Sequence, residues 1–89
     1  MLELKNILEK RGFKVYNDKR ENEWWLEKQD PMVNGVLKIR IARVQHPKTL
    51  EWEWSVQLQA PFRAEIKEYS KNKNKIISFL KDDKNFKNI

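Results

Sequence analysis

Few residues in this chain have the type and spacing that enzyme chemistry requires. His46 is the only histidine, and no serine or cysteine motif supplies the positioned partner that a general base needs. Asp82 and Asp83 are adjacent on an expected helix, so their carboxylates diverge and make a poor metal pair. Gly12 and Gly35 are the only glycines, which excludes a glycine-rich phosphate loop. We therefore expect no catalytic residues, no metal, no cofactor and no enzymatic activity.

The tryptophans have a more informative spacing. Trp24 and Trp25 are adjacent, and neighbouring residues of a strand point to opposite faces, so the two rings cannot both lie in one core. Alternation with the flanking residues places Trp24 inward and Trp25 outward. Residues 50–58 alternate strictly between apolar and polar types, which predicts a half-buried strand with Trp52 and Trp54 in the core.

An outward-facing tryptophan on a sheet is a candidate for binding. Basic side chains of the next strand could lie over the ring of Trp25. Tryptophan and arginine often anchor protein interfaces, and acidic neighbours supply a suitable polar border. The acidic residues expected on this side are Glu23, Glu27, Glu51 and Glu53. The residues expected at the centre of a protein contact are Tyr16, Trp25, Lys38 and Arg40.

Basic residues form a second candidate site. The formal net charge is +6, and residues 1–20 and 62–89 carry the excess, whereas residues 21–61 are nearly neutral. A positive excess favours acidic partners such as nucleic acid, although a lysine- and asparagine-rich composition also suits an ordinary solvated surface. The side chains that would contact nucleic acid are Lys71, Lys73, Lys75, Arg11 and Lys14.

These candidate residues need a scaffold, and the periodicity of the chain predicts most of it. Residues 2–11 have apolar side chains at helical spacing, with Gly12 where a C-terminal cap is expected. Four strands are expected within GFKVY, EWWLEK, VLKIRIARV and LEWEWSVQL. The inward residues of these strands are Phe13, Val15, Trp24, Leu26, Leu37, Ile39, Ile41, Trp52, Trp54, Val56 and Leu58.

The third and fourth strands are expected to form a hairpin with a tight turn at His46 and Pro47. If their apolar residues share one face, the numbers of paired residues must sum to an odd value. A tight turn at His46 and Pro47 gives pairs whose residue numbers sum to 93. The expected pairs are Ile41 with Trp52, Ile39 with Trp54 and Arg40 with Glu53.

The chain after Pro61 allows two interpretations. Apolar residues fit one helical stripe over residues 62–81, but SKNKNK interrupts it. The alternative is a loop or short helix followed by a final helix with Ser70 as its N-cap. The second interpretation is favoured slightly. Residues 83–89 are expected to fray unless Phe86 and Ile89 dock.

Together these elements predict an α+β fold. We expect a two-layer sandwich in which a four-stranded, mainly antiparallel sheet carries both helices on one face, in the order α-β-β-β-β-α. At 89 residues the chain has the length of one domain, placed at residues 1–82. The absence of cysteine suits a reducing compartment, and no apolar run is long enough for a membrane span. A cytoplasmic location is therefore expected.

The function expected from the sequence is binding rather than catalysis. A non-enzymatic protein-interaction module, contacting a protein partner or a second copy of itself, is favoured because the outward sheet face carries a tryptophan among balanced charges. Nucleic-acid binding through the basic helical lysines is the alternative. In length and composition the chain resembles small proteins of phages and mobile elements; the resemblance implies a regulator or inhibitor that binds a protein.

Overall fold

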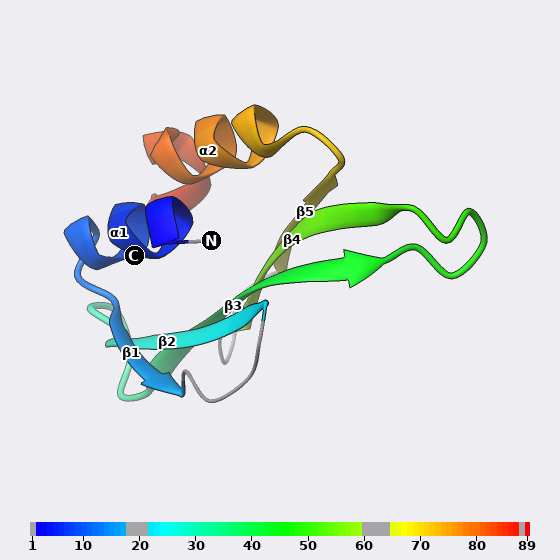
Figure 1. Ribbon diagram of the computed structural model, residues 1–89. Helices are drawn as coiled ribbons and strands as arrows, with labels where there is room; N and C mark the ends of the chain where they lie inside the picture. Colours follow the sequence, from blue (N-terminus) through cyan, green and yellow to red (C-terminus); the bar gives the residue numbers. More distant parts are fainter. Residues whose placement is uncertain (1, 18–21, 60–64, 88) are drawn as a thin grey trace.

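The computed structural model describes residues 2–17, 22–59, 65–87 and 89. Figure 1 shows helices together with an antiparallel sheet, which confirms the α+β class. The elements in chain order are α1 (Leu2–Lys10), β1 (Lys14–Asn17), β2 (Glu23–Gln29), β3 (Val36–Gln45), β4 (Trp52–Gln59), β5 (Ile66–Ser70), α2 (Lys73–Lys81) and the 3-10 helix η1 (Asp83–Phe86).

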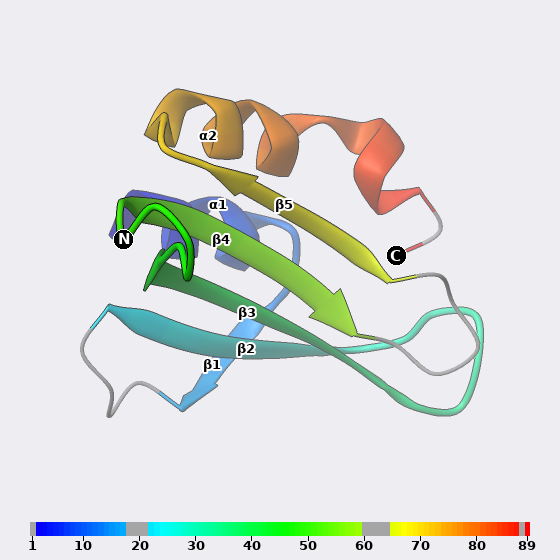
Figure 2. The same ribbon diagram turned by 90° about the vertical axis from the view of Figure 1, so that its right-hand side faces the viewer.

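Within the described residues the sheet has five strands, so the prediction of four strands is wrong. Its order is β1-β2-β3-β4-β5, and each neighbouring pair is antiparallel, as Figure 2 shows. The additional strand β5 pairs with β4 from Leu58↔Ile66 to Trp54↔Ser70. It forms where a helix or loop was expected, because β4 has backbone groups on both edges and β5 supplies hydrogen-bonding partners for the second edge.

The two helices end and begin at identifiable caps. Gly12, the second residue after α1, has φ +94°, which confirms the expected C-terminal cap. A single helix over residues 62–81 is wrong, because β5 occupies part of that range; residues 60–64 lie outside the described residues. The N-cap of α2 is Asn72 rather than Ser70, and its side chain accepts a hydrogen bond from the Asn74 N–H at 2.9 Å.

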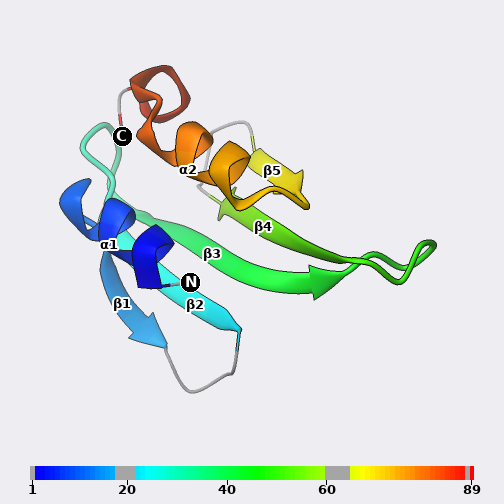
Figure 3. The same ribbon diagram turned by 45° about the horizontal axis from the view of Figure 1, so that its top comes forward.

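One hydrophobic core joins the helices to the sheet. One side of the sheet, which we call the core face, carries the buried residues Leu26, Leu37, Ile39, Ile41, Val56 and Leu58. The helical members of the same buried cluster are Leu4, Leu8, Ile76 and Leu80, and Figure 3 shows α1 and α2 beside one another. Phe86, in the segment expected to fray, is also buried in this cluster, and Ile89 packs against it.

The β3–β4 hairpin has a wider turn than expected. Observed pairs include Ile41↔Val56 and Gln45↔Trp52, so the predicted pairing of Ile41 with Trp52 is wrong. The side chain of His46 organises the turn, because its Nδ1 accepts hydrogen bonds from the Lys48 and Thr49 N–H groups at 3.1 and 3.3 Å. The sums of paired residue numbers remain odd, and therefore the two faces of the strands are as predicted.

The shifted register places the two tryptophans of β4 in different environments. Trp54 is half-buried against the core, with Arg43 Cζ and Lys73 Nζ lying 4.6 and 5.7 Å from its ring centroid. Trp52 pairs with Gln45 near the end of β3 and remains 50% exposed. The prediction that Trp52 is a core residue is therefore wrong.

Leu50 adopts an unusual backbone conformation in the hairpin turn. Its φ is +62° and its side chain is 64% exposed, so the residue is strained without contributing to the core. Asparagine tolerates this conformation better, and we expect Leu50→Asn to raise the free energy of unfolding by about 0.5–1 kcal/mol. Urea denaturation checks this result, with Leu50→Ala as the control that removes the side chain but keeps the strain. An Asn variant no more stable than the Ala variant would contradict it.

Candidate functional site

The predicted contact residues lie together on the side of the sheet opposite the core face, which we call the outer face. Trp25 pairs with Arg40 across β2 and β3, and the guanidinium Cζ lies 6.0 Å from the centroid of the indole ring. The rings of Tyr16 and Trp25 have centroids 6.3 Å apart, and Lys38 Nζ lies 5.6 Å from the Tyr16 centroid. The structure thus brings Tyr16, Trp25, Lys38 and Arg40 into one patch of two aromatic rings with two cations beside them.

A carboxylate anchors this patch. Glu23 Oε1 accepts hydrogen bonds from Trp25 Nε1 at 2.5 Å and from Arg40 Nε at 2.8 Å. The Glu23 side chain is only 12% exposed and that of Arg40 is 26% exposed, so the ion pair is partly shielded from water. Glu23 therefore fixes both the indole ring and the guanidinium group. The sequence predicted that Glu23 lies at the polar border of the contact. Its position two residues before Trp25 was the sequence signal that its carboxylate could reach the indole ring.

Tyr16 is the more exposed of the two rings. Its side chain is 43% exposed, and it follows Val15 at an irregularity in the β1–β2 pairing. The pKa of Tyr16 is raised above its ordinary value. Partial burial of the phenol is the larger cause, and the negative charge of Glu27 is the smaller one. The phenol is therefore a neutral hydrogen-bond donor at neutral pH. Since the pKa is higher in the folded state, this group favours folding below its unfolded pKa, and the contribution is lost as pH rises through the folded pKa.

Tyr69 extends the aromatic surface on the other side of the outer face. It pairs with Ser55, which in turn pairs with Ala42, and both small residues are buried. Tyr69 remains 46% exposed on β5. A shallow hollow adjoins it, lined by Val44, Gln45, His46, Pro47, Glu53 and Tyr69. Sequence reasoning missed Tyr69 because this segment was assigned to a helix or loop.

Acids and bases are balanced on the outer face within the described parts of the strands. Alternation and pairing place the bases Lys14, Lys38, Arg40 and Lys67 on this face. The same reasoning places the acids Glu23, Glu27 and Glu53 there, and Glu65 adds a fourth through its contacts with Gln57 and Lys67. A mixed face of this kind suits a protein partner better than a polyanion, because acids beside the rings repel phosphates.

The basic residues of the alternative site do not form one surface. Lys71 forms an ion pair with Glu51, and Lys73 Nζ lies 3.2 Å from Glu3 Oε2 at the start of α1. Arg11 follows the other end of α1, whereas Lys14 belongs to the outer face. Lys75 is exposed on α2. The structure therefore places Lys71, Lys73 and Lys75 at the start of α2, Arg11 after α1 and Lys14 on the outer face, and Lys71, Lys73 and Arg11 each pair with an acid.

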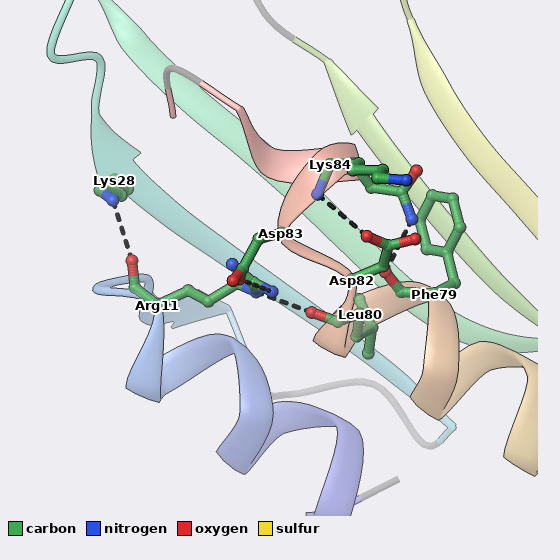
Figure 4. A network of polar contacts seen from close by, with 8 residues as sticks. Arg11, Lys28, Phe79, Leu80, Asp82, Asp83 and Lys84 are labelled. Carbon is green, nitrogen blue, oxygen red and sulfur yellow. Dashed lines mark hydrogen bonds and ion pairs between the residues drawn. The ribbon is translucent and has the colours of Figure 1, made fainter.

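Arg11 forms hydrogen bonds with other parts of the fold, which Figure 4 shows. Its Nε donates to the Leu80 carbonyl oxygen at 2.7 Å, and Nη2 donates to Asp83 Oδ1 at 3.0 Å. Lys28 Nζ donates to the Arg11 carbonyl oxygen at 2.9 Å. Asp82 Oδ1 accepts from the Lys84 N–H at 3.0 Å. The adjacent carboxylates Asp82 and Asp83 thus have separate local partners at the end of α2.

Comparisons of the chain with protein-family models, with curated proteins and with solved structures found no match. Within the described part of the chain, no group of three or more histidine, aspartate or glutamate side chains could hold a metal ion. No described helix is long and apolar enough to cross a membrane. The outer face is therefore the feature from which a function is best inferred.

Proposed function

We propose that this protein is a small non-enzymatic interaction module that binds a protein partner through its outer face. The observation that carries the proposal is the anchoring of Trp25 and Arg40 by Glu23, beside the exposed ring of Tyr16. Buried residues of both helices belong to the same hydrophobic cluster as the core-face residues, which supports a partner contact on the opposite, outer face. The proposed role is that of a regulator or inhibitor of the phage or mobile-element type, acting in the cytoplasm.

Preorganisation is the physical reason why this patch suits binding. Ordering a flexible side chain at an interface costs about 0.5–1.5 kcal/mol. The Glu23 hydrogen bonds already restrict Trp25 and Arg40 in the free protein, so less of this cost remains to be met on association. Tyrosine, tryptophan and arginine are also the residues most often found at the energetic centre of interfaces.

Nucleic-acid binding has weaker support. A sequence-tolerant binder of single strands combines exposed aromatic rings with a positive groove that follows the backbone. Here Glu23 and Glu27 lie beside the rings, and Lys71 and Lys73 are paired with acids elsewhere. The charge balance of the outer face therefore favours a protein partner, and nucleic acid becomes a distinguishable outcome of the test.

The test compares matched variants in the retention of a partner. Immobilised wild-type protein and the variants Tyr16→Ala and Lys38→Glu are exposed to extract of the cells that produce this protein. Lys75→Glu is the matched control, because it makes the same charge change on α2. We expect one defined protein to bind the wild type and the control, and to bind each outer-face variant about 30-fold more weakly, corresponding to about 2 kcal/mol.

Two outcomes would count against the proposal. Equal retention by the wild type and the outer-face variants would show that the outer face is not the contact surface. Retention of nucleic acid that is lost in Lys75→Glu and kept in Tyr16→Ala would favour the alternative function. Thermal unfolding of each variant is measured in parallel, so that a loss of folding is not mistaken for a loss of binding.

A further inference from the structure

A two-stranded ribbon extends beyond the rest of the sheet. It comprises residues 43–54, the ends of β3 and β4 with their connecting turn. The pairing of β2 with β3 ends at Glu23↔Ala42, and the pairing of β5 with β4 ends at Trp54↔Ser70. Figures 1 and 3 show the ribbon projecting away from the helices. Most of it therefore has no neighbouring strand among the described residues on either side.

The ribbon exposes two large apolar side chains that the isolated chain does not use. Trp52 is 50% exposed and Leu50 is 64% exposed. Leu50 also has φ +62°, a conformation that favours glycine or asparagine. A strained, exposed leucine beside an exposed tryptophan lowers the stability of the monomer. Such features concentrate at functional sites, where the side chain serves a purpose other than folding.

Trp52 lies two residues before Trp54, whose ring is next to the start of α2. Trp52 and Trp54 are two residues apart in β4, so their side chains point to the same side of the sheet, the core-face side. Lys73, the first residue of α2, lies over the Trp54 ring and pairs with Glu3 in the first turn of α1. The ribbon and the two helix starts thus form an inner corner. Leu2, at the beginning of α1, is 61% exposed.

The charge of this corner suits a second copy of the same chain. The net charge of the chain is +6, so two copies repel one another through most of their surfaces. On the ribbon, however, Arg43 and Lys48 are matched by Glu51 and Glu53. At its base Lys73 pairs with Glu3, and Lys71 pairs with Glu51 of the ribbon, so the ribbon and its base together carry one excess positive charge. Two copies can therefore meet here while most of the excess charge of each copy stays away from the contact.

We propose that two copies of this chain dimerise through the ribbon. The ribbons lie antiparallel with their Trp52 sides in contact, and each turn, with Leu50, reaches the helix starts of the other copy. This contact is isologous and closes with two-fold symmetry, so it yields a dimer rather than a filament. Because the ribbon is short, the interface is below the standard size of about 800 Å² per partner, and the dimer is weak.

The dimer surface is separate from the proposed partner site. Trp52 points to the core-face side, whereas Tyr16 and Trp25 belong to the outer face. The dimer can therefore form while the outer face is free, and it would present two outer faces to partners. The inference does not depend on the proposed function, and either can fail alone.

Sedimentation velocity of the purified chain tests the dimer over concentrations from about 10 μM to about 1 mM, where an interface below standard size associates. We expect the wild type to change from monomer to dimer in this range. Trp52→Ala should raise the dissociation constant at least about 30-fold. Met32→Ala is the matched control, because Met32 is 63% exposed in the connection that precedes β3, at the far end of the strand from the ribbon. It should leave the dimer unchanged.

Leu50→Asn separates association from folding, since it should weaken the dimer while stabilising the monomer. A chain that remains monomeric at every concentration would overturn the proposal, as would a dimer insensitive to both Trp52→Ala and Leu50→Asn. A dimer lost in Tyr16→Ala and kept in Trp52→Ala would also overturn it, because the two copies would then meet at the outer face.

Discussion

Replacing Trp54 with alanine should lower the free energy of unfolding by about 2–4 kcal/mol, whereas Trp52→Ala should lower it by less than about 1 kcal/mol. The two residues have the same type, strand and face, but the observed register places them differently. Trp54 packs against the core beneath Arg43 and Lys73, while Trp52 is 50% exposed on the ribbon. Removing Trp54 leaves a cavity, and removing Trp52 exposes little new apolar surface.

Urea denaturation of the two variants measures this difference directly. The measurements belong at low protein concentration, where self-association does not contribute to stability. With the tight turn expected from the sequence, Trp52 and Trp54 would both pair with core isoleucines, and both substitutions would be costly. Similar losses of stability in the two variants would therefore contradict the observed register of β3 and β4.

Arg11→Ala should lower the free energy of unfolding by about 2–4 kcal/mol, because it removes charge-assisted hydrogen bonds and a cation–π contact. The Arg11 guanidinium bonds to the Leu80 carbonyl and Asp83, and its Cζ lies 4.4 Å from the Phe86 ring centroid. These contacts join the end of α1 to the end of α2 and to η1. The Arg11 side chain is 20% exposed but that of Asp83 is 95% exposed, so solvent screens the ion pair, and the Leu80 hydrogen bond and the Phe86 contact supply most of the effect.

Two further variants identify the cause of the Arg11 effect. Arg11→Lys should recover less than half of the loss, since an ammonium group lacks the planar fork that reaches two acceptors at once. Lys75→Ala, on the exposed side of α2, should leave stability unchanged within about 0.5 kcal/mol. Thermal and urea unfolding check these values. An Arg11→Ala variant as stable as Lys75→Ala would show that the network in Figure 4 does not support the fold.

The amphipathic patterns of the sequence were sufficient to predict the first helix and the faces of the long strands. The α1 helix ends before Gly12 as expected, because the left-handed conformation there favours glycine. In β3 and β4, alternation placed Ile39, Ile41 and Val56 on the buried side. Alternation works for these strands because one face is buried and the other is polar.

The register of the hairpin could not be predicted from the same pattern. Every odd sum of paired residue numbers keeps the apolar residues on one face, so alternation alone does not distinguish a tight turn from a wider one. The choice depends on hydrogen bonds within the turn, where His46 Nδ1 accepts from two backbone N–H groups. That small difference in turn geometry moves Trp52 from the core to the ribbon.

The sequence analysis did not predict the fifth strand, β5, for a different reason. In β5 only Ile66 and Ser70 are partly buried, and the residues between them are exposed. A short edge strand with this pattern carries little alternation in its sequence, since its stability comes from backbone pairing with β4. For the same reason Tyr69 could not be recognised from the sequence as a residue that adjoins the outer face.

The candidate site was predictable in its members but not in its internal contacts. Adjacent tryptophans required one ring to face outward, and the pairing of Trp25 with Arg40 follows from antiparallel strands. The role of Glu23 depends on side-chain rotamers, which direct its carboxylate to Trp25 Nε1 and Arg40 Nε together. Hydrophobic patterns contain no information on such rotamers.

The most direct test of the outer face as a protein-contact surface is site-specific photocrosslinking in cells that produce this protein. A photoreactive phenylalanine analogue replaces Tyr16, an aromatic residue that is 43% exposed, and in a parallel sample it replaces the exposed Lys75. We predict that irradiation joins position 16 covalently to one defined protein and that position 75 gives no such adduct. Adducts to nucleic acid, or a protein adduct formed from position 75 and absent at position 16, would contradict the proposed function.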